Sequence, residues 1–116
     1  NHSLKYFKAD LSIIKNLDNL ANDIKREYNS IDILINNAGA YFSQYSETEE
    51  QLEMTFALNH LSYFQLTMLL IDAIEFEIPG RVINVASSAH FGAKLDLNDI
   101  QIKKNIKVGL LTVIQN

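Results

Sequence analysis

Small and polar residues that could contact a ligand follow three short apolar runs in the sequence. If the runs are parallel strands, these residues lie together at the carboxyl edge of one sheet, where open α/β sheets bind their ligands. A hydroxyl or carboxamide there could hydrogen-bond a substrate oxygen, and a glycine would let the backbone approach a ligand closely. The residues are Asp10 after the first run, Asn36, Asn37, Ala38 and Gly39 after the second, and Ser87 and Ser88 after the third.

Several of the candidate residues also have a purely structural interpretation. Asp10 could cap a helix or be a solvated acid, and Gly39 could be an ordinary turn glycine. Asn59 lies on the apolar stripe of a predicted helix. It could be a core amide with satisfied hydrogen bonds or a functional residue, because asparagine is unfavourable inside helices. His60 and His90 are expected to pack rather than to catalyse.

The apolar runs and the polar segments between them predict three strands separated by two helices. Strands are expected at residues 4–9, 31–35 and 81–86, since each run is short and rich in β-branched, aromatic or other apolar residues. Ser12 is the expected N-cap of an amphipathic helix that continues to Tyr28.

A second, longer helix is expected from Ser46 toward Ile74. Ser46 and Glu49 match a capping box at its start. Alternation of strands and helices predicts right-handed βαβ units and a parallel sheet covered by helices. Near the C-terminus, residues 95–100 could form a loop with a turn of helix, and residues 108–114 could be helix or strand.

Composition is that of a globular domain and excludes several kinds of function. The chain has 116 residues, of which 47% are hydrophobic and 21% charged, which argues against disorder. Its net charge of -4 provides no basic field for nucleic acid. The absence of cysteine excludes disulfides, thiolate zinc sites and cysteine nucleophiles, and fits a reducing compartment. The most apolar segment, residues 63–74, is too short to span a bilayer.

Four segments resemble motifs of the short-chain dehydrogenase/reductase family. Residues 33–39 resemble its hydrophobic strand with the Asn-Asn-Ala-Gly motif, and residues 56–61 resemble the helical segment that holds its catalytic asparagine. Residues 81–90 resemble the strand that ends at its catalytic serine, and residues 10–12 its Asp-Leu pair after the third strand. The Asn-His-Leu and Ser-Ala-His details are most similar to the retinol-dehydrogenase-like branch. These motifs follow the family's order over about residues 4–92.

The resemblance implies a doubly wound Rossmann-type α/β fold with three layers (αβα) that binds NAD or NADP. Asp10 would accept a hydrogen bond from the adenine amino group. Asn59 would distort its helix and hold a water on the proton path. Ser87, which follows Asn84 by three residues, is preferred over Ser88 as the catalytic serine. The full set implied for the adenine and ribose side of the cofactor is Asp10, Leu11, Asn37, Ala38 and Gly39.

The implied role of Ser87 is to stabilise charge, not to attack the substrate. Its hydroxyl would hydrogen-bond the substrate carbonyl oxygen as charge develops there. The sequence places no base beside it to make a nucleophile.

Two parts that the family uses are absent from this sequence. The family's acid/base is a tyrosine followed four residues later by a lysine, which lowers the tyrosine pKa. The last tyrosine here is Tyr63, which precedes Ser87. The four glycines, at positions 39, 80, 92 and 109, do not have the spacing of a phosphate-binding loop.

The predicted strands correspond to strands 3, 4 and 5 of a sheet ordered 3-2-1-4-5-6. At about 4.8 Å per strand, roughly 14 Å would separate strand 3 from strand 4. Residues 4–9 must therefore stay unpaired, pair wrongly, or depend on sequence outside this chain.

We therefore expect residues 1–116 to be part of an NAD(P)-binding Rossmann domain, an interior piece of a longer protein with both ends cut. The expected activity is hydride transfer between an alcohol and a carbonyl, with this piece inactive alone and NADP favoured over NAD by the branch it resembles. The alternative is a truncated, non-catalytic Rossmann-like binding protein. Another Rossmann-like protein, such as a methyltransferase, would not explain the Asn-Asn-Ala-Gly motif, Asn59 and Ser87 together.

The expected partner is a small alcohol or carbonyl compound. A longer parent protein could form a homo-oligomer. A cytoplasmic location is expected, with membrane association of that parent left open.

Overall fold

The computed structural model describes residues 4–74, 80–88, 91 and 95–103. Within them, β1 (Ile33–Asn36) and β2 (Arg81–Asn84) form a parallel two-stranded sheet. The register pairs Ile33 with Arg81 at one end and Asn36 with Asn84 at the other. The parallel pairing of the second and third predicted strands is therefore confirmed, and the third strand ends at Asn84, before the expected Ala86.

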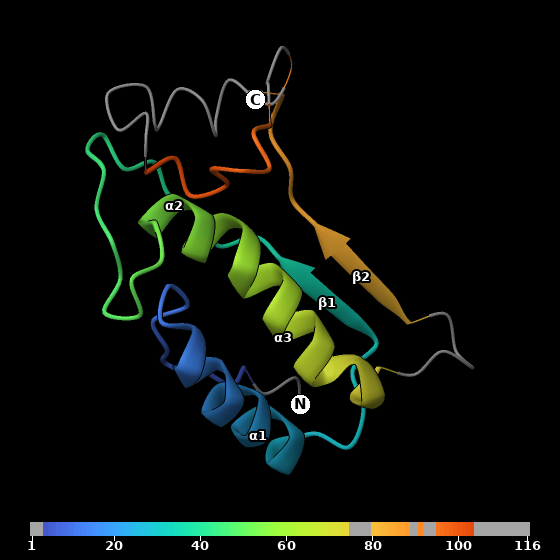
Figure 1. The fold of residues 1–116 in the computed structure, drawn as a ribbon. Coiled ribbons are helices and arrows are strands. Elements are labelled where there is room, and N and C mark those ends of the chain that lie inside the picture. Colours follow the sequence, from blue (N-terminus) through green and yellow to red (C-terminus); the bar gives the residue numbers. More distant parts are fainter. Residues whose placement is uncertain (1–3, 75–79, 89–90, 92–94, 104–116) are drawn as a thin grey trace.

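A helical region lies between the two strands in the chain and covers one face of the sheet (Figure 1). It runs through α2 (Met54–Phe56), a π-helical segment η2 (Ala57–Leu61), α3 (Ser62–Leu70) and a 3-10 turn η3 (Ile71–Ala73). Because the strands on either side of this crossover are parallel, the arrangement is an incomplete Rossmann-type α/β unit, as the sequence predicted.

Helix α1 (Leu17–Glu27) precedes β1 and packs against α3 (Figure 1). A 3-10 turn, η1 (Ile14–Asn16), leads into it. The apolar stripe that predicted this helix buries Leu17 and Ala21, while lysines and acids face solvent. Leu70 of α3 is also fully buried, so the small core lies where α1 and α3 meet the sheet.

Alternate residues of the strands point to opposite faces of the sheet. Asn36 points toward α3, where its Nδ2 donates to Thr67 Oγ1 at 3.0 Å. Ile33, Ile35 and Ile83 point to the other face and remain 53%, 58% and 42% exposed. The described part of the chain thus provides a helix layer on one face of the sheet only.

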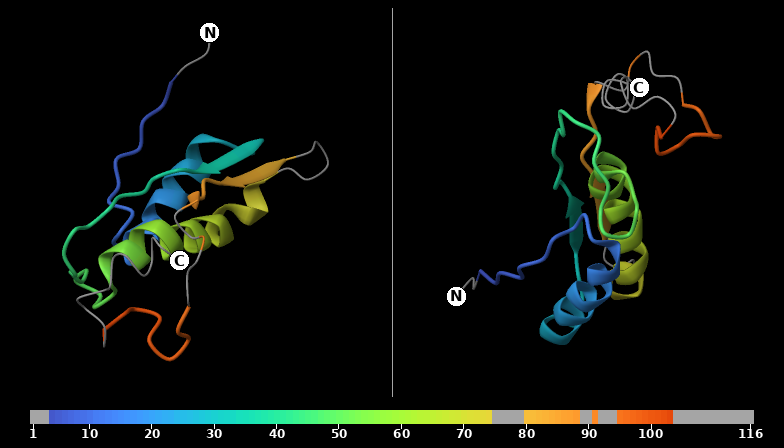
Figure 2. Two further views of the ribbon diagram at one scale, coloured as in Figure 1. Left: turned by 90° about the horizontal axis from the view of Figure 1, so that it is seen from above. Right: turned by 60° about the vertical axis from the view of Figure 1, so that its left-hand side comes forward.

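The predicted strand at residues 4–9 is not formed. These residues have no strand partner, and Leu4 and Tyr6 are 98% and 81% exposed. Figure 2 shows the segment leaving the body of the molecule beside α1. A strand needs a neighbour for its hydrogen bonds, and the neighbour of strand 3 in the doubly wound order would be strand 2. The segment could have stayed unpaired, paired wrongly or depended on sequence outside this chain, and in the structure it stays unpaired. An ion pair between Lys5 and Glu27, at 2.7 Å, connects it to α1.

The predicted cap of α1 is also wrong. Ser12 does not cap the helix; its backbone N–H and its hydroxyl donate to Asp10 Oδ1 at 3.0 and 2.7 Å. The carboxylate of Glu50 instead accepts from the backbone N–H of Ile14 at 2.7 Å and of Lys15 at 2.9 Å. Glu50 thus binds the start of η1, the 3-10 turn that leads into α1, and the N-cap of α1 itself, Asn16, makes no side-chain cap bond. Because Glu50 comes from a distant segment, the local pattern could not reveal this contact.

The capping box at Ser46 and Glu49 does not form, because residues 46–53 fold into a tight turn. In this turn Thr48 N–H donates to Leu52 O at 2.8 Å, and Gln51 has a φ of 60°. The helix begins seven residues later than Glu47, at Met54, with Glu53 as its N-cap.

Part of the C-terminal region that had alternative predictions can be described. Residues 95–103 form successive turns without a regular helix. Residues 108–114, for which helix or strand was expected, lie outside the described residues, as does His90.

Candidate cofactor and substrate site

Gly39 and Ser87 follow the carboxyl ends of β1 and β2. Their positions correspond, because Asn36 and Asn84 are register partners and each candidate lies three residues further along. The prediction that these two residues share one edge of the sheet is confirmed. Asp10 does not follow a strand, because residues 4–9 do not form one.

The end of the sheet is held together by Asn36, which is 5% exposed. Its Nδ2 donates to Asn84 Oδ1 at 2.8 Å and to Thr67 Oγ1 at 3.0 Å. One amide therefore ties both strand ends to α3. The sequence placed Asn36 only within the ligand-binding motif, and its buried side chain instead has a structural role.

An open hollow of about 950 Å³ lies beside this edge. Its walls come from the unpaired segment, from α1, and from the residues just after β1 and within η2. Of the expected cofactor residues, Asp10, Leu11 and Ala38 line it, whereas Asn37 and Gly39 do not. The lining residues are Tyr6, Phe7, Lys8, Ala9, Asp10, Leu11, Asn16, Asn19, Leu20, Asp23, Ala38 and Leu58.

Asn59 lies at the centre of the π-helical segment. Its Oδ1 accepts from Ala40 N–H at 3.1 Å, and its Nδ2 donates to Ala40 O at 3.0 Å. The carboxamide thus makes two hydrogen bonds to the backbone of the loop that follows β1. Its role in holding a water stays a prediction.

The loop after β1 passes close to this amide. A Cβ atom added at Gly39 would lie 3.4 Å from Asn59 Oδ1, an ordinary contact distance. His60, the neighbour of Asn59, stacks on Phe56 with ring centroids 5.3 Å apart. This contact is the packing role expected for His60.

Ser87 and Ser88 are both exposed after the end of β2. Ser88 O accepts from Phe91 N–H at 3.1 Å. The preference for Ser87 over Ser88 as the catalytic residue stays a prediction.

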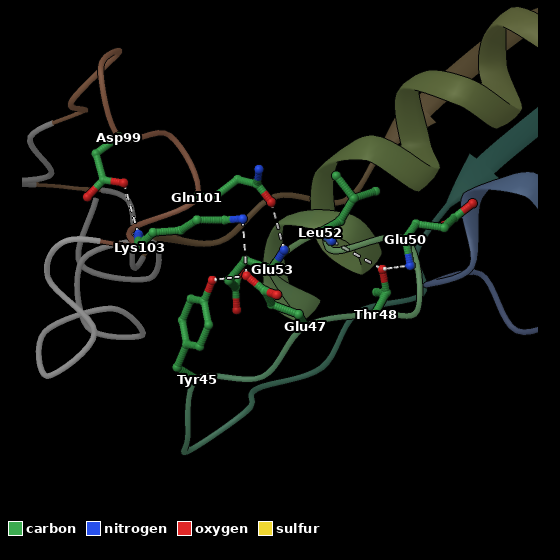
Figure 3. Close-up of polar contacts among 9 residues, drawn as sticks. All are labelled: Tyr45, Glu47, Thr48, Glu50, Leu52, Glu53, Asp99, Gln101 and Lys103. Carbon is green, nitrogen blue, oxygen red and sulfur yellow. Dashed lines mark hydrogen bonds and ion pairs between the residues drawn. The ribbon is translucent and has the colours of Figure 1, made fainter.

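A polar cluster near the start of α2 was not anticipated from the sequence (Figure 3). Tyr45 donates to Glu47 Oε1 at 2.7 Å, and Lys103 Nζ lies 3.2 Å from the same oxygen. Burial, together with Glu47, raises the pKa of Tyr45 to about 12, whereas the bonds from Tyr45 and Lys103 lower the pKa of Glu47. A tyrosine with so high a pKa is poorly suited to exchange its proton at neutral pH. Tyr45 is therefore no substitute for the family's acid/base.

The described residues lack two features that would suggest other functions. They contain no group of three or more His, Cys, Asp or Glu side chains that could hold a metal ion. None of their helices is both long and apolar enough to cross a membrane.

Comparison with known sequences agrees with the motifs. The family profile described as short chain dehydrogenase matches residues 1–95. Human retinol dehydrogenase 13 is 39% identical over 100 residues, which cover 86% of this chain and 30% of that protein. Human retinol dehydrogenase 12 is 38% identical over 102 residues, which cover 88% of this chain and 32% of that protein. The chain thus spans about a third of the length of these relatives.

Solved structures also resemble the fold of this chain. An uncharacterized protein from Mycobacterium paratuberculosis matches with a TM-score of 0.76 and 27% identity, over 92% of this chain and 37% of that one. RhlG from Pseudomonas aeruginosa, solved with NADP, matches with a TM-score of 0.60 and 29% identity, over 82% of this chain and 40% of that one. Motifs, fold and relatives agree, and the chain belongs to the short-chain dehydrogenase/reductase family, with retinol dehydrogenases among its relatives.

Proposed function

We propose that this chain carries part of the site of an NAD(P)-dependent oxidoreductase that transfers hydride between an alcohol and a carbonyl. The observation that carries the proposal is the matched position of Gly39 and Ser87 after the paired ends of β1 and β2. This arrangement brings a cofactor-binding turn and a hydroxyl donor to one edge of the sheet. Residues 1–116 would then be part of the NAD(P)-binding domain.

The residues present fit the adenosine side of a nicotinamide cofactor. Asp10, Leu11 and Ala38 line the same open hollow, which is large enough for a nucleoside. The two hydrogen bonds to Asp10 that fix its orientation both use Oδ1. We expect Oδ2 to accept from the adenine amino group, and the exposed backbone at Asn37 and Gly39 to border the ribose.

On the substrate side, the Ser87 hydroxyl would donate a hydrogen bond to the substrate oxygen and stabilise the charge that develops there. Asn59 would place a water near this path, while its amide keeps the Gly39–Ala40 turn in position. When bound, the nicotinamide cofactor supplies or accepts the hydride. NADP is favoured over NAD by the branch that the motifs resemble, in line with the NADP complex of RhlG.

The substrate is expected to be a small alcohol or carbonyl compound, and retinol is the first to test because of the relatives' names. Homo-oligomer formation and a cytoplasmic location of the whole protein stay predictions. Membrane association of a longer parent protein, which the sequence left open, also stays a prediction.

A chimera tests the proposal. Residues 1–95 of this chain would replace the matching part of human retinol dehydrogenase 13, which supplies the parts missing here. We expect the chimera to oxidise or reduce substrate with NAD or NADP, and Ser87→Ala to abolish most of the turnover. A chimera that folds and binds cofactor without turnover would favour the alternative, a non-catalytic Rossmann-like binding protein.

A further inference from the structure

Glu47 and Glu53, which precede α2, contact two residues of the segment that follows Ser87 (Figure 3). The backbone N–H of Glu53 donates to Gln101 Oε1 at 2.9 Å, although the two residues are 48 positions apart. Lys103 Nζ pairs with Glu47 Oε1 at 3.2 Å. We call these four residues, Glu47, Glu53, Gln101 and Lys103, the latch.

The turn that contains Gln101 and Lys103 has a constrained backbone conformation. Ile102, between the two latch residues of this turn, is 6% exposed and has a φ of 56°. A β-branched residue is unfavourable in this left-handed conformation, which persists only where surrounding contacts impose it. Those contacts include Ile102 N–H to Asp99 O and Lys103 N–H to Asp99 Oδ1, both at 2.9 Å.

Glu53 connects the latch to the helix that carries Asn59. Its side chain is buried, and its carboxylate accepts from the backbone N–H of Thr55 at 3.0 Å and of Phe56 at 2.7 Å. It therefore fixes the start of the helix, just before the π-helical segment. From that segment Asn59 reaches Ala40 with both polar atoms of its amide.

We infer that the latch is a positioning device that couples the segment after Ser87 to the loop at Gly39 and Ala40. Gln101 holds Glu53, Glu53 sets the helix start, and the helix presents Asn59 to the loop. Glu53 and Gln101 are thus positioning residues. The inference rests on the proposed function for the meaning of Ser87 and Gly39, but the contacts exist without any cofactor.

Amide hydrogen exchange in the 116-residue chain tests the coupling without a cofactor. The readouts are exchange at Ala40 N–H and the NMR resonances of the Asn59 side-chain amide. Gln101→Leu removes the acceptor for Glu53 N–H and leaves the helix cap intact. We expect it to speed exchange at Ala40 about fivefold, the effect of losing roughly one hydrogen bond, and to shift the Asn59 resonances.

Variants at two neighbouring acids separate coupling from general loosening. Glu53→Ala should act in the same direction as Gln101→Leu, and Glu53→Asp should restore native values, because aspartate is a good N-cap. Glu50→Ala, which removes the carboxylate bound to the start of η1 and leaves the latch untouched, should leave both readouts unchanged. If Glu53→Ala does not fold, the comparison of Gln101→Leu with Glu50→Ala decides.

The inference is overturned if Gln101→Leu leaves exchange at Ala40 native, or if Glu50→Ala speeds it equally. Addition of NADP is a separate arm of the experiment. Failure of NADP to bind would count against the proposed function and would not affect the latch result.

Discussion

At the scale of single residues, the site depends on register. Asn36 and Asn84 end the paired strands, and the side chain of Asn36 bonds to that of Asn84. Counting three residues from each of these partners leads to Gly39 after β1 and to Ser87 after β2. Ser88 lies one residue further along the chain.

We expect Ser87→Ala in the retinol dehydrogenase 13 chimera to lower turnover by about 10²–10³, the usual cost of losing a donor to a developing oxyanion. Cofactor affinity should stay near native. Ser88→Ala is the matched control and should reduce turnover far less. Steady-state kinetics and a separate cofactor titration measure the two effects. A damaging Ser88→Ala with a neutral Ser87→Ala would move the site by one residue and leave the family assignment intact.

At Gly39 the effect should fall on cofactor binding. Space exists for one extra carbon, since a Cβ there would lie 3.4 Å from Asn59 Oδ1. Gly39→Ala should therefore be tolerated by the fold. Gly39→Val adds two further carbons, which would disturb the Asn59 amide and occupy the space expected for the ribose.

Cofactor titration of the two Gly39 variants in the chimera checks this expectation, with Gly39→Val binding more weakly than Gly39→Ala. Equal affinities for the native, alanine and valine forms would mean that the cofactor does not approach this turn.

At the scale of elements, the sequence predicted the interior of each helix and strand better than its ends. Apolar periodicity located α1, and short β-branched runs located β1 and β2, because these patterns report burial directly. Helix starts were misplaced because their caps, Glu50 and Glu53, depend on tertiary contacts or on the tight turn before α2. The latch was missed for the same reason, since no local pattern pairs residues 48 positions apart.

The tertiary contact between Glu50 and the start of η1 leads to a stability prediction. Glu50→Ala leaves the backbone N–H groups of Ile14 and Lys15 without their carboxylate, so the free energy of unfolding should fall by about 1 kcal/mol. Urea denaturation of the 116-residue chain measures it. Glu49→Ala breaks only the exposed ion pair with Lys15 and should cost less than about 0.5 kcal/mol. If both variants lose the same stability, the bonds from Glu50 do not act as a cap.

Tyr45 should make the fold sensitive to alkali. Its pKa is raised to about 12 in the fold, from an ordinary value of 10.0. A raised folded pKa gives stabilisation that is complete below the unfolded pKa and is lost as pH rises through the folded one. The free energy of unfolding should therefore fall between about pH 10 and pH 12.

Urea denaturation across that pH range compares the native chain with Tyr45→Phe, in which the decline should be shallower. Tyr6→Phe, at a tyrosine that is 81% exposed, should keep the native slope. Lysines titrate in the same range in all three proteins, so only the differences between slopes report on Tyr45. Coincident slopes for the native chain and Tyr45→Phe would contradict the prediction.

At the scale of the whole molecule, the chain provides one edge of a binding site without the structure that would surround it. Parallel sheets are normally covered on both faces, yet Ile33, Ile35 and Ile83 are exposed on one face of this two-stranded sheet. Residues 4–9 have a strand-like pattern and no strand to pair with. Pattern alone could not predict their final state, because pairing depends on the neighbours as well as on the segment.

The incomplete site leads to the last prediction, that the purified 116-residue chain has no dehydrogenase or reductase turnover. No tyrosine follows Tyr63 in the sequence, so the family's tyrosine–lysine acid/base pair is absent. Tyr45, with a pKa of about 12, would not exchange protons readily at neutral pH. The glycine spacing of a phosphate-binding loop is also lacking, which should weaken cofactor binding.

The measurement is formation of reduced nicotinamide from NAD or NADP with simple alcohols or retinol, and loss of NADH or NADPH with the corresponding carbonyl compounds. The retinol dehydrogenase 13 chimera, which is expected to supply both missing parts, is the positive control. Turnover by the isolated chain that Ser87→Ala removes would contradict the prediction. It would mean that another group performs the proton transfer, since a serine that only stabilises charge cannot replace the missing acid/base.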